Sequence, residues 1–98
     1  MDLKAIQKMN QPVEFRSGTE VVLAMTEELG EIAQEVALLE RVGTKKNWEK
    51  QPSKERLGEE ISHLLNLLTA LANINQINLS ELYERKQGLR ETKETKNE

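Results

Sequence analysis

Three acidic residues in the first half of the chain lie at the spacing that places their side chains on one helix face. Glu28, Glu31 and Glu35 are separated by three and four residues, and such positions are neighbours on a helix. Like charges at this spacing repel by about 0.2–0.5 kcal/mol per pair, and a bound cation would offset that repulsion. Carboxylates are oxygen ligands suited to magnesium or manganese. The pattern therefore makes the three acids candidates for a metal site.

A further acidic residue lies three positions before the only histidine of the chain. Glu60 and His63 share a helix stripe whose later positions are apolar. Beside it runs a stripe that is polar throughout and indicates a wet cleft: Glu59, Ser62, Asn66, Thr69 and Asn73. A short connection favours antiparallel packing of the two helices. In that case we expect this acid and this histidine to converge with Glu28 and Glu31 on one dication.

Each of these features also has an ordinary structural interpretation. A single pair of acids on a helix is most often solvated surface, and a lone histidine on a helix flank is most often structural. Two matched acidic groups, each bordering an apolar stripe, favour the metal site. Trp48 is expected to anchor the connecting loop rather than to stack on a base. The nearby lysines are usually solvated charge but could also contact phosphates: Lys45, Lys46 and Lys50.

The residue pattern predicts that helices position these side chains. A short leading helix is indicated within residues 1–18 by apolar residues at helical spacing. A long helix is predicted from about Thr19 to near Gly43, followed by a connection rich in Lys, Asn, Gly and Pro. The buried stripe of this long helix is expected to contain Val22, Met25, Leu29, Ile32, Val36 and Leu39.

A second long helix is predicted from Lys54 to about Asn75, with Ser53 as its N-cap. Its buried stripe is expected to contain Leu57, Ile61, Leu64, Leu65, Leu68, Leu71 and Ala72. A third helix should begin after Asn78 or Ser80, either of which can cap it. Residues 91–98 are expected to form a frayed tail.

The composition indicates a single all-α domain over residues 1–98, built as an antiparallel helical bundle. Phe, Tyr and Trp occur once each, so the core must be aliphatic. The chain has no cysteine, which excludes a disulfide framework, a thiolate zinc site and a cysteine nucleophile. The formal net charge of -3 argues against binding to nucleic acid or to an anionic membrane. With no signal-peptide or membrane-spanning pattern, we expect a soluble, cytoplasmic protein.

Two motifs resemble those of the MazG-like, all-α nucleoside triphosphate pyrophosphohydrolase superfamily. EELGE at 27–31 and EEISH at 59–63 are similar to its EExxE and ExxD motifs, and the likeness continues through LLNLLTALANINQINLSELYERK, covering roughly residues 21–86. By position, the resemblance implies metal ligands at Glu28, Glu31, Glu60 and His63, with Glu27 a less essential acid of the first motif. It also implies substrate contacts at Asn73, Lys86 and Arg90. In this family a second subunit commonly completes the bundle, which agrees with the small core expected of 98 residues.

One position departs from the family pattern, because His63 stands where the motif has Asp. An imidazole nitrogen replaces an anionic oxygen, so magnesium affinity should fall while manganese, zinc or another transition ion is better tolerated. The alternative is a degenerate relative that binds nucleotide, or forms a structural dimer, without catalysis. The phosphoribosyl-ATP pyrophosphatase branch shares the metal motif and is a third alternative.

The reaction implied by the resemblance is hydrolysis of an NTP or dNTP to NMP and pyrophosphate, with Mg²⁺ or Mn²⁺ as cofactor. Glu31 or Glu35 is the candidate to accept the proton of the attacking water. The chain contains no glycine-rich phosphate-binding loop of the GxxxxGK[ST] type. We therefore expect metal and basic side chains to hold the phosphates. A homodimer and a homotetramer are equally compatible with the sequence, and neither base nor sugar specificity is encoded in these motifs.

Overall fold

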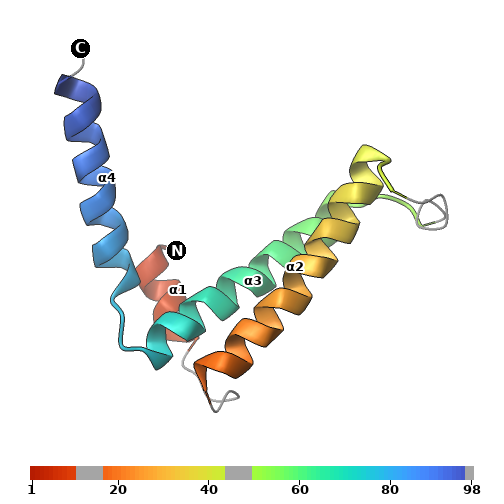
Figure 1. Ribbon diagram of the computed structural model, residues 1–98, viewed down its shortest axis with the longest axis horizontal. Coiled ribbons are helices and arrows are strands. Elements are labelled where there is room, and N and C mark those ends of the chain that lie inside the picture. Colours follow the sequence, from red (N-terminus) through yellow and green to blue (C-terminus); the bar gives the residue numbers. More distant parts are fainter. Residues whose placement is uncertain (11–16, 44–49, 97–98) are drawn as a thin grey trace.

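The protein is all-helical over the residues that the structure describes. The computed structural model describes residues 1–10, 17–43 and 50–96, with side chains up to position 88. Within these ranges it contains no strand and consists of α1 (Leu3–Met9), α2 (Gly18–Glu40), α3 (Lys54–Ile74) and α4 (Leu79–Lys96) (Figure 1). The expected fold class is confirmed. No helix in the described ranges is both long and apolar enough to span a membrane.

Each helix begins at a polar side chain that caps it. Asp2, Ser17, Ser53 and Asn78 each accept a hydrogen bond from the backbone N–H three residues further on. Such a cap satisfies one of the donors that the first helical turn leaves free. The predicted caps of the two later helices are confirmed, and Asn78 rather than Ser80 begins the last one. At its other end α2 stops at Arg41, whose φ of 55° is left-handed, slightly before the predicted end.

The two long helices form an antiparallel hairpin with one line of contact. They lie side by side along their length (Figure 1), and the pair makes the most extensive helix–helix contact of the described chain. We call the line where they meet the seam. Three pairs of side chains across the two helices define it, and helical spacing extends it in both directions. By that spacing its α2 side is Val21, Ala24, Glu28, Glu31, Glu35 and Leu38, and its α3 side is Arg56, Glu60, His63, Leu67 and Ala70. Val21, Leu38 and Ala70 are buried.

The predicted core stripes are wrong at several positions, although Ala72 of the α3 stripe is buried as predicted. Val22 and Leu29 on α2 are 46% and 59% exposed, and Ile61 and Leu68 on α3 are 51% and 40% exposed. The helices meet instead along the stripe displaced by one position, which has small residues near one end and charges in its middle. Periodicity indicates that a stripe will be buried, but it does not say against which partner.

Four of the exposed aliphatic residues lie on one side of the hairpin. Each follows a seam position by one residue, and in an antiparallel pair of right-handed helices that step turns both side chains to the same side. We call this surface the outer aliphatic face, defined by Val22, Leu29, Ile61 and Leu68. The opposite side of α3 carries the polar stripe that begins at Glu59.

Helix α1 covers part of that polar stripe, so the predicted wet cleft is wrong at its C-terminal end. The side-chain amide of Asn73 donates to the backbone carbonyls of Gln7 (2.7 Å) and Asn10 (2.9 Å). Asn10 in turn donates to Asn66 at 3.2 Å. The side chain of Gln7 reaches across to the turn between α3 and α4, where it donates to the carbonyl of Ile77 at 2.6 Å. These bonds fix α1 where α3 ends.

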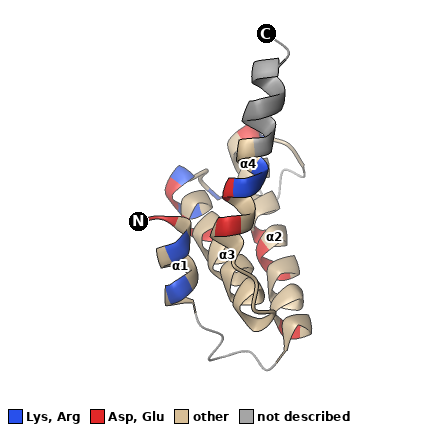
Figure 2. Cartoon of the chain, turned by 90° about the vertical axis from the view of Figure 1, so that its left-hand side faces the viewer, with Lys and Arg blue, Asp and Glu red and all other residues tan. Residues whose placement is uncertain are grey.

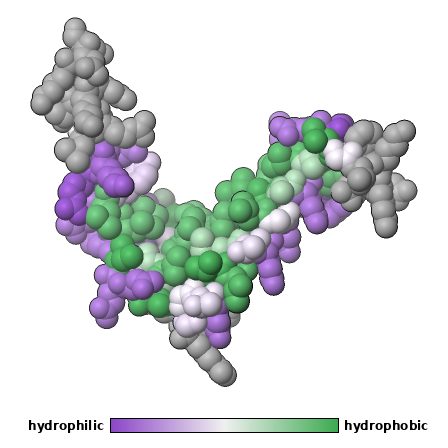
Figure 3. All heavy atoms as spheres, viewed as in Figure 1, coloured by the Kyte–Doolittle hydropathy of each residue, from purple (hydrophilic) through white to green (hydrophobic). Residues whose placement is uncertain are grey.

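The molecule is open rather than compact. Helix α4 leads away from the hairpin, and the two arms make a V (Figure 1). The radius of gyration is 17.2 Å, whereas a compact chain of this length has about 13 Å. Figure 3 shows apolar side chains along the inner side of the V and over its base. The helix continues to Lys96, although the sequence predicts a frayed tail from residue 91.

Candidate metal centre

Three pairs of polar side chains face each other across the middle of the seam. Glu28 lies opposite His63, and Glu35 lies opposite Arg56. Between these pairs, Glu31 interacts with Glu60. Each step of three or four residues along α2 is matched by the same step backwards along α3, which is the register of an antiparallel hairpin. Helix geometry thus brings together residues that are far apart in sequence.

In the pair nearest the connecting loop, the negative charge of Glu35 is balanced by the positive charge of Arg56. Arg56 Nε donates to both carboxylate oxygens of Glu35, at 2.9 and 3.0 Å. The Glu35 side chain is only 7% exposed, whereas that of Arg56 is 35% exposed. Arg56 Nη2 also donates to the carbonyl of Gln51. The carboxylate of Glu35 thus has its own cation, so Glu35 is the weaker of the two candidates for a proton acceptor.

The next positions along the seam hold acids without such a cation. One possible ligand atom from each of Glu28, Glu60 and His63 lies within 4.8 Å of the others. His63 Nδ1 lies 3.6 Å from Glu28 Oε1 and 3.8 Å from Glu60 Oε2, distances that are too long for hydrogen bonds. The Oε2 atoms of both glutamates are buried and have no hydrogen-bond partner. A buried oxygen left in this state destabilises the protein.

Glu31 lies at the exposed rim of this cluster. A hydrogen bond with Glu60, and the negative charge of that carboxylate, raise the pKa of Glu31 above its usual 4.5. Desolvation acts in the same direction, while His63 and a hydrogen bond with Glu28 oppose it. Two carboxyl groups can share a hydrogen bond only while one holds a proton, so the raised pKa reflects crowding of like charges.

The donor set suits a divalent ion. Three carboxylates and one imidazole come from two packed helices, and two of the carboxylate oxygens are buried without a partner. Ligands of an octahedral ion of the size of magnesium lie about 3–4 Å apart, so the spread of up to 4.8 Å among the ligand atoms of Glu28, Glu60 and His63 requires only small side-chain movements. We call Glu28, Glu31, Glu60 and His63 the acid cluster. Three of the four predicted metal ligands, Glu28, Glu60 and His63, have possible ligand atoms close to one another, whereas Glu31 lies at the exposed rim and is not in that group.

The residues predicted to bind substrate lie elsewhere or outside the described side chains. Asn73 is engaged by α1. Lys86 is exposed on α4, and Figure 2 shows that α4 leads away from the acidic residues of α2. The side chain of Arg90 is outside the described part. Lys50 is exposed, and Lys45, Lys46 and Trp48 lie outside the described residues.

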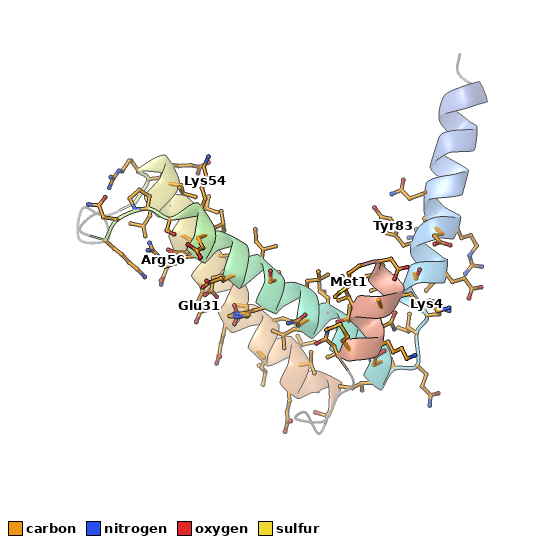
Figure 4. The ribbon with its side chains drawn as sticks, turned by 180° about the vertical axis from the view of Figure 1, so that it is seen from behind. Met1, Lys4, Glu31, Lys54, Arg56 and Tyr83 are labelled. Carbon is orange, nitrogen blue, oxygen red and sulfur yellow. The ribbon has the colours of Figure 1, made fainter. Side chains whose placement is uncertain are left out.

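Sequence reasoning missed the role of Arg56. This residue lies four positions before Glu60 and seven before His63, so it continues their stripe towards the start of α3. The spacing alone could have placed a cation in line with the acids. Figure 4 shows Arg56 and Glu31 on the two facing helices, towards the loop end of the hairpin.

Comparison of the chain with protein-family models, with curated proteins and with solved structures finds no match.

Proposed function

We propose that the protein is a metal-dependent nucleoside triphosphate pyrophosphohydrolase of the MazG-like type, converting an NTP or dNTP to NMP and pyrophosphate. The observation that carries this proposal is the acid cluster, in which two buried carboxylate oxygens have no partner. The resemblance of the EELGE and EEISH motifs supports the same reaction. Mg²⁺ or Mn²⁺ is the proposed cofactor, and His63 favours manganese or another transition ion.

The residues of the acid cluster have separate roles in this proposal. Glu28, Glu60 and His63 hold the ion. When bound, a divalent ion would neutralise phosphate charge and make the attacked phosphorus more electrophilic. Glu31, at the exposed rim beside these ligands, is the candidate to accept the proton of the attacking water. The bond that breaks joins the α-phosphorus to the oxygen bridging the α- and β-phosphates, and pyrophosphate leaves.

The experiment that tests this proposal is an assay of pyrophosphate release from a panel of NTPs and dNTPs with Mg²⁺, Mn²⁺ or Co²⁺. The matched variants are Glu28→Gln and Glu27→Gln, which make the same chemical change at a seam position and at the exposed position beside it. We expect turnover in the wild type and in Glu27→Gln, and loss of turnover in Glu28→Gln. Absence of turnover with every pairing of substrate and metal would overturn the proposal.

A second candidate function is nucleotide binding or a structural role without catalysis. It is favoured by His63, whose Nδ1 lies within ion-pair distance of both Glu28 and Glu60. A protonated imidazole could neutralise the cluster without a metal. Under this alternative the wild type is inactive and His63→Asp, which restores the family motif, gains hydrolysis. Loss of an existing activity in His63→Asp would instead identify histidine as a dedicated ligand.

We also propose that a second copy of the chain covers the outer aliphatic face and completes a four-helix bundle. The accessible surface is 7863 Å², whereas a compact chain of 11.2 kDa exposes about 5,700 Å². The excess is of the size that stable homodimers bury. We expect sedimentation velocity to give a dimer or tetramer for the wild type and for Ser62→Lys, and a monomer for Ile61→Lys. A monomeric wild type would contradict this assignment.

A further inference from the structure

Arg56 is a cation in a place where helix stability does not require one. It lies in the first turn of α3, three residues after the N-cap Ser53. The helix dipole makes that end of a helix partly positive, so a positive side chain is disfavoured there and an anion is favoured. Its own carboxylate partner, Glu35, comes from the other helix. The placement of this guanidinium therefore calls for an explanation beyond the capping of α3.

The guanidinium of Arg56 has more N–H donors than the described residues use. Arginine carries five N–H donors. The single Nε–H is shared between the two oxygens of Glu35, and Nη2 donates once, to the carbonyl of Gln51. Among the described residues, the remaining three donors have no partner. Because Glu35 fixes the group through Nε, the two Nη nitrogens lie at the end that is not held by the carboxylate.

The position of Arg56 relative to the acid cluster suits phosphate binding. Residues four apart on a helix face have Cβ atoms about 5–6 Å apart, so the guanidinium lies one turn along the seam from Glu60. Its side chain is 35% exposed, which leaves it accessible to a ligand. A polyphosphate whose oxygens reach an ion between Glu28 and Glu60 would extend over about this distance.

We propose that Arg56 binds phosphate oxygens of the polyphosphate chain, and that Glu35 is the positioning residue that holds its guanidinium in place. This inference rests on the proposed function and extends it by naming the residue that recognises the substrate's phosphates. Arginine matches phosphate geometry with two parallel N–H donors, which lysine cannot do. Glu35 accordingly supports binding and does not itself accept a proton.

The experiment measures binding of inorganic tripolyphosphate by isothermal titration calorimetry in the presence of Mn²⁺. The main variant is the double substitution Glu35→Met with Arg56→Met, which leaves the net charge of the seam unchanged. Replacement of a buried ion pair by apolar residues of similar size is often tolerated, and circular dichroism verifies the helix content. Lys54→Met is the matched control, because Lys54 lies in the same turn but about 200° around the helix from Arg56.

We expect the double variant to bind Mn²⁺ as the wild type does, and to bind tripolyphosphate about 10- to 100-fold more weakly, the range for loss of charged hydrogen bonds. Arg56→Lys keeps the charge but loses the paired donors, and its affinity should fall between the two. Lys54→Met should match the wild type. Unchanged tripolyphosphate affinity in both the double variant and Arg56→Lys overturns the proposed role of Arg56 but not the proposed function. Failure of the wild type itself to bind tripolyphosphate overturns the proposed function together with this inference.

Discussion

Two adjacent parts of the same seam hold carboxylates with buried oxygens, and among the described residues only one of these parts has an arginine partner. Glu35 is paired with Arg56 at 2.9 Å. Further along the seam, Glu60, one turn from Arg56, and Glu28, two turns from Glu35, each have a buried oxygen without a partner. Both sets of carboxylates lie between the same two helices, α2 and α3. The difference is that the carboxylate of Glu35 has a cationic partner from the chain, whereas the two oxygens without a partner lie where we propose that an external ion binds.

The largest effect that follows from this comparison is on turnover. Glu60→Gln keeps the size of the side chain but removes a negative charge from the acid cluster. We expect pyrophosphate release to fall by about 100- to 1,000-fold, equivalent to about 3–4 kcal/mol of transition-state stabilisation. Glu59→Gln, the same substitution at the exposed neighbouring position, should keep wild-type activity. Equal losses of activity in the two variants would mean that Glu60 has no special role compared with its exposed neighbour Glu59.

The second effect is on folding stability in metal-free buffer, where the two parts of the seam should respond in opposite directions. Arg56→Met leaves Glu35 buried and unpaired, and we expect the free energy of unfolding to fall by about 2–3 kcal/mol. This is below the value for a fully buried pair because the Arg56 side chain is 35% exposed. Glu60→Met relieves repulsion and should leave stability unchanged or raised. Urea unfolding measures the free energy of unfolding of both variants. Destabilisation by Glu60→Met would show that the carboxylate of Glu60 already has a favourable partner without a metal ion.

A smaller effect concerns metal preference. His63→Asp replaces an imidazole nitrogen by an anionic oxygen, which favours magnesium over transition ions. We expect the magnesium dissociation constant to fall by about tenfold, equivalent to about 1.4 kcal/mol, with little gain for manganese. Competition titrations of the two ions measure this change. An unaltered preference would indicate that His63 is not a ligand.

The smallest effect is the dependence of stability on pH. The folded-state pKa of Glu31 is raised above 4.5, so the folded state holds this proton more tightly than the unfolded state does. The resulting stabilisation is fully present below the unfolded pKa and is lost as the pH rises through the folded pKa. We expect Glu31→Gln to lose less stability than the metal-free wild type as the pH rises from 4.5 to neutrality. Parallel curves of the urea midpoint for the two proteins would contradict this.

Much of the fold could be predicted from sequence because it depends on local chemistry. Helical periodicity located the long helices, and the caps Ser53 and Asn78 marked where two of them begin. Residues of the acid cluster could be predicted because the spacing of three fixes which side chains share a face, and antiparallel packing brings the faces together. The convergence of Glu28, Glu60 and His63 follows from those two facts.

What could not be predicted depends on contacts between distant parts of the chain. The amide of Asn73 bonds to a carbonyl 66 residues away, and nothing near Asn73 in sequence signals that partner. The choice of seam likewise depends on which stripe fits the neighbouring helix. Leu29 and Ile61 belong to strong apolar stripes, yet they are left exposed, because periodicity alone does not determine which stripe packs against the neighbouring helix.

The central claim is that the acid cluster binds a divalent ion, and a calorimetric titration with Mn²⁺ tests it most directly. Three proteins are compared: the wild type, the double variant Glu28→Gln with Glu60→Gln, and the double variant Glu35→Met with Arg56→Met. The account predicts that the first and third bind Mn²⁺ alike, and that the second binds at least about 100-fold more weakly, equivalent to about 2.7 kcal/mol. Absence of binding in the wild type, or equal affinity in all three, would contradict it.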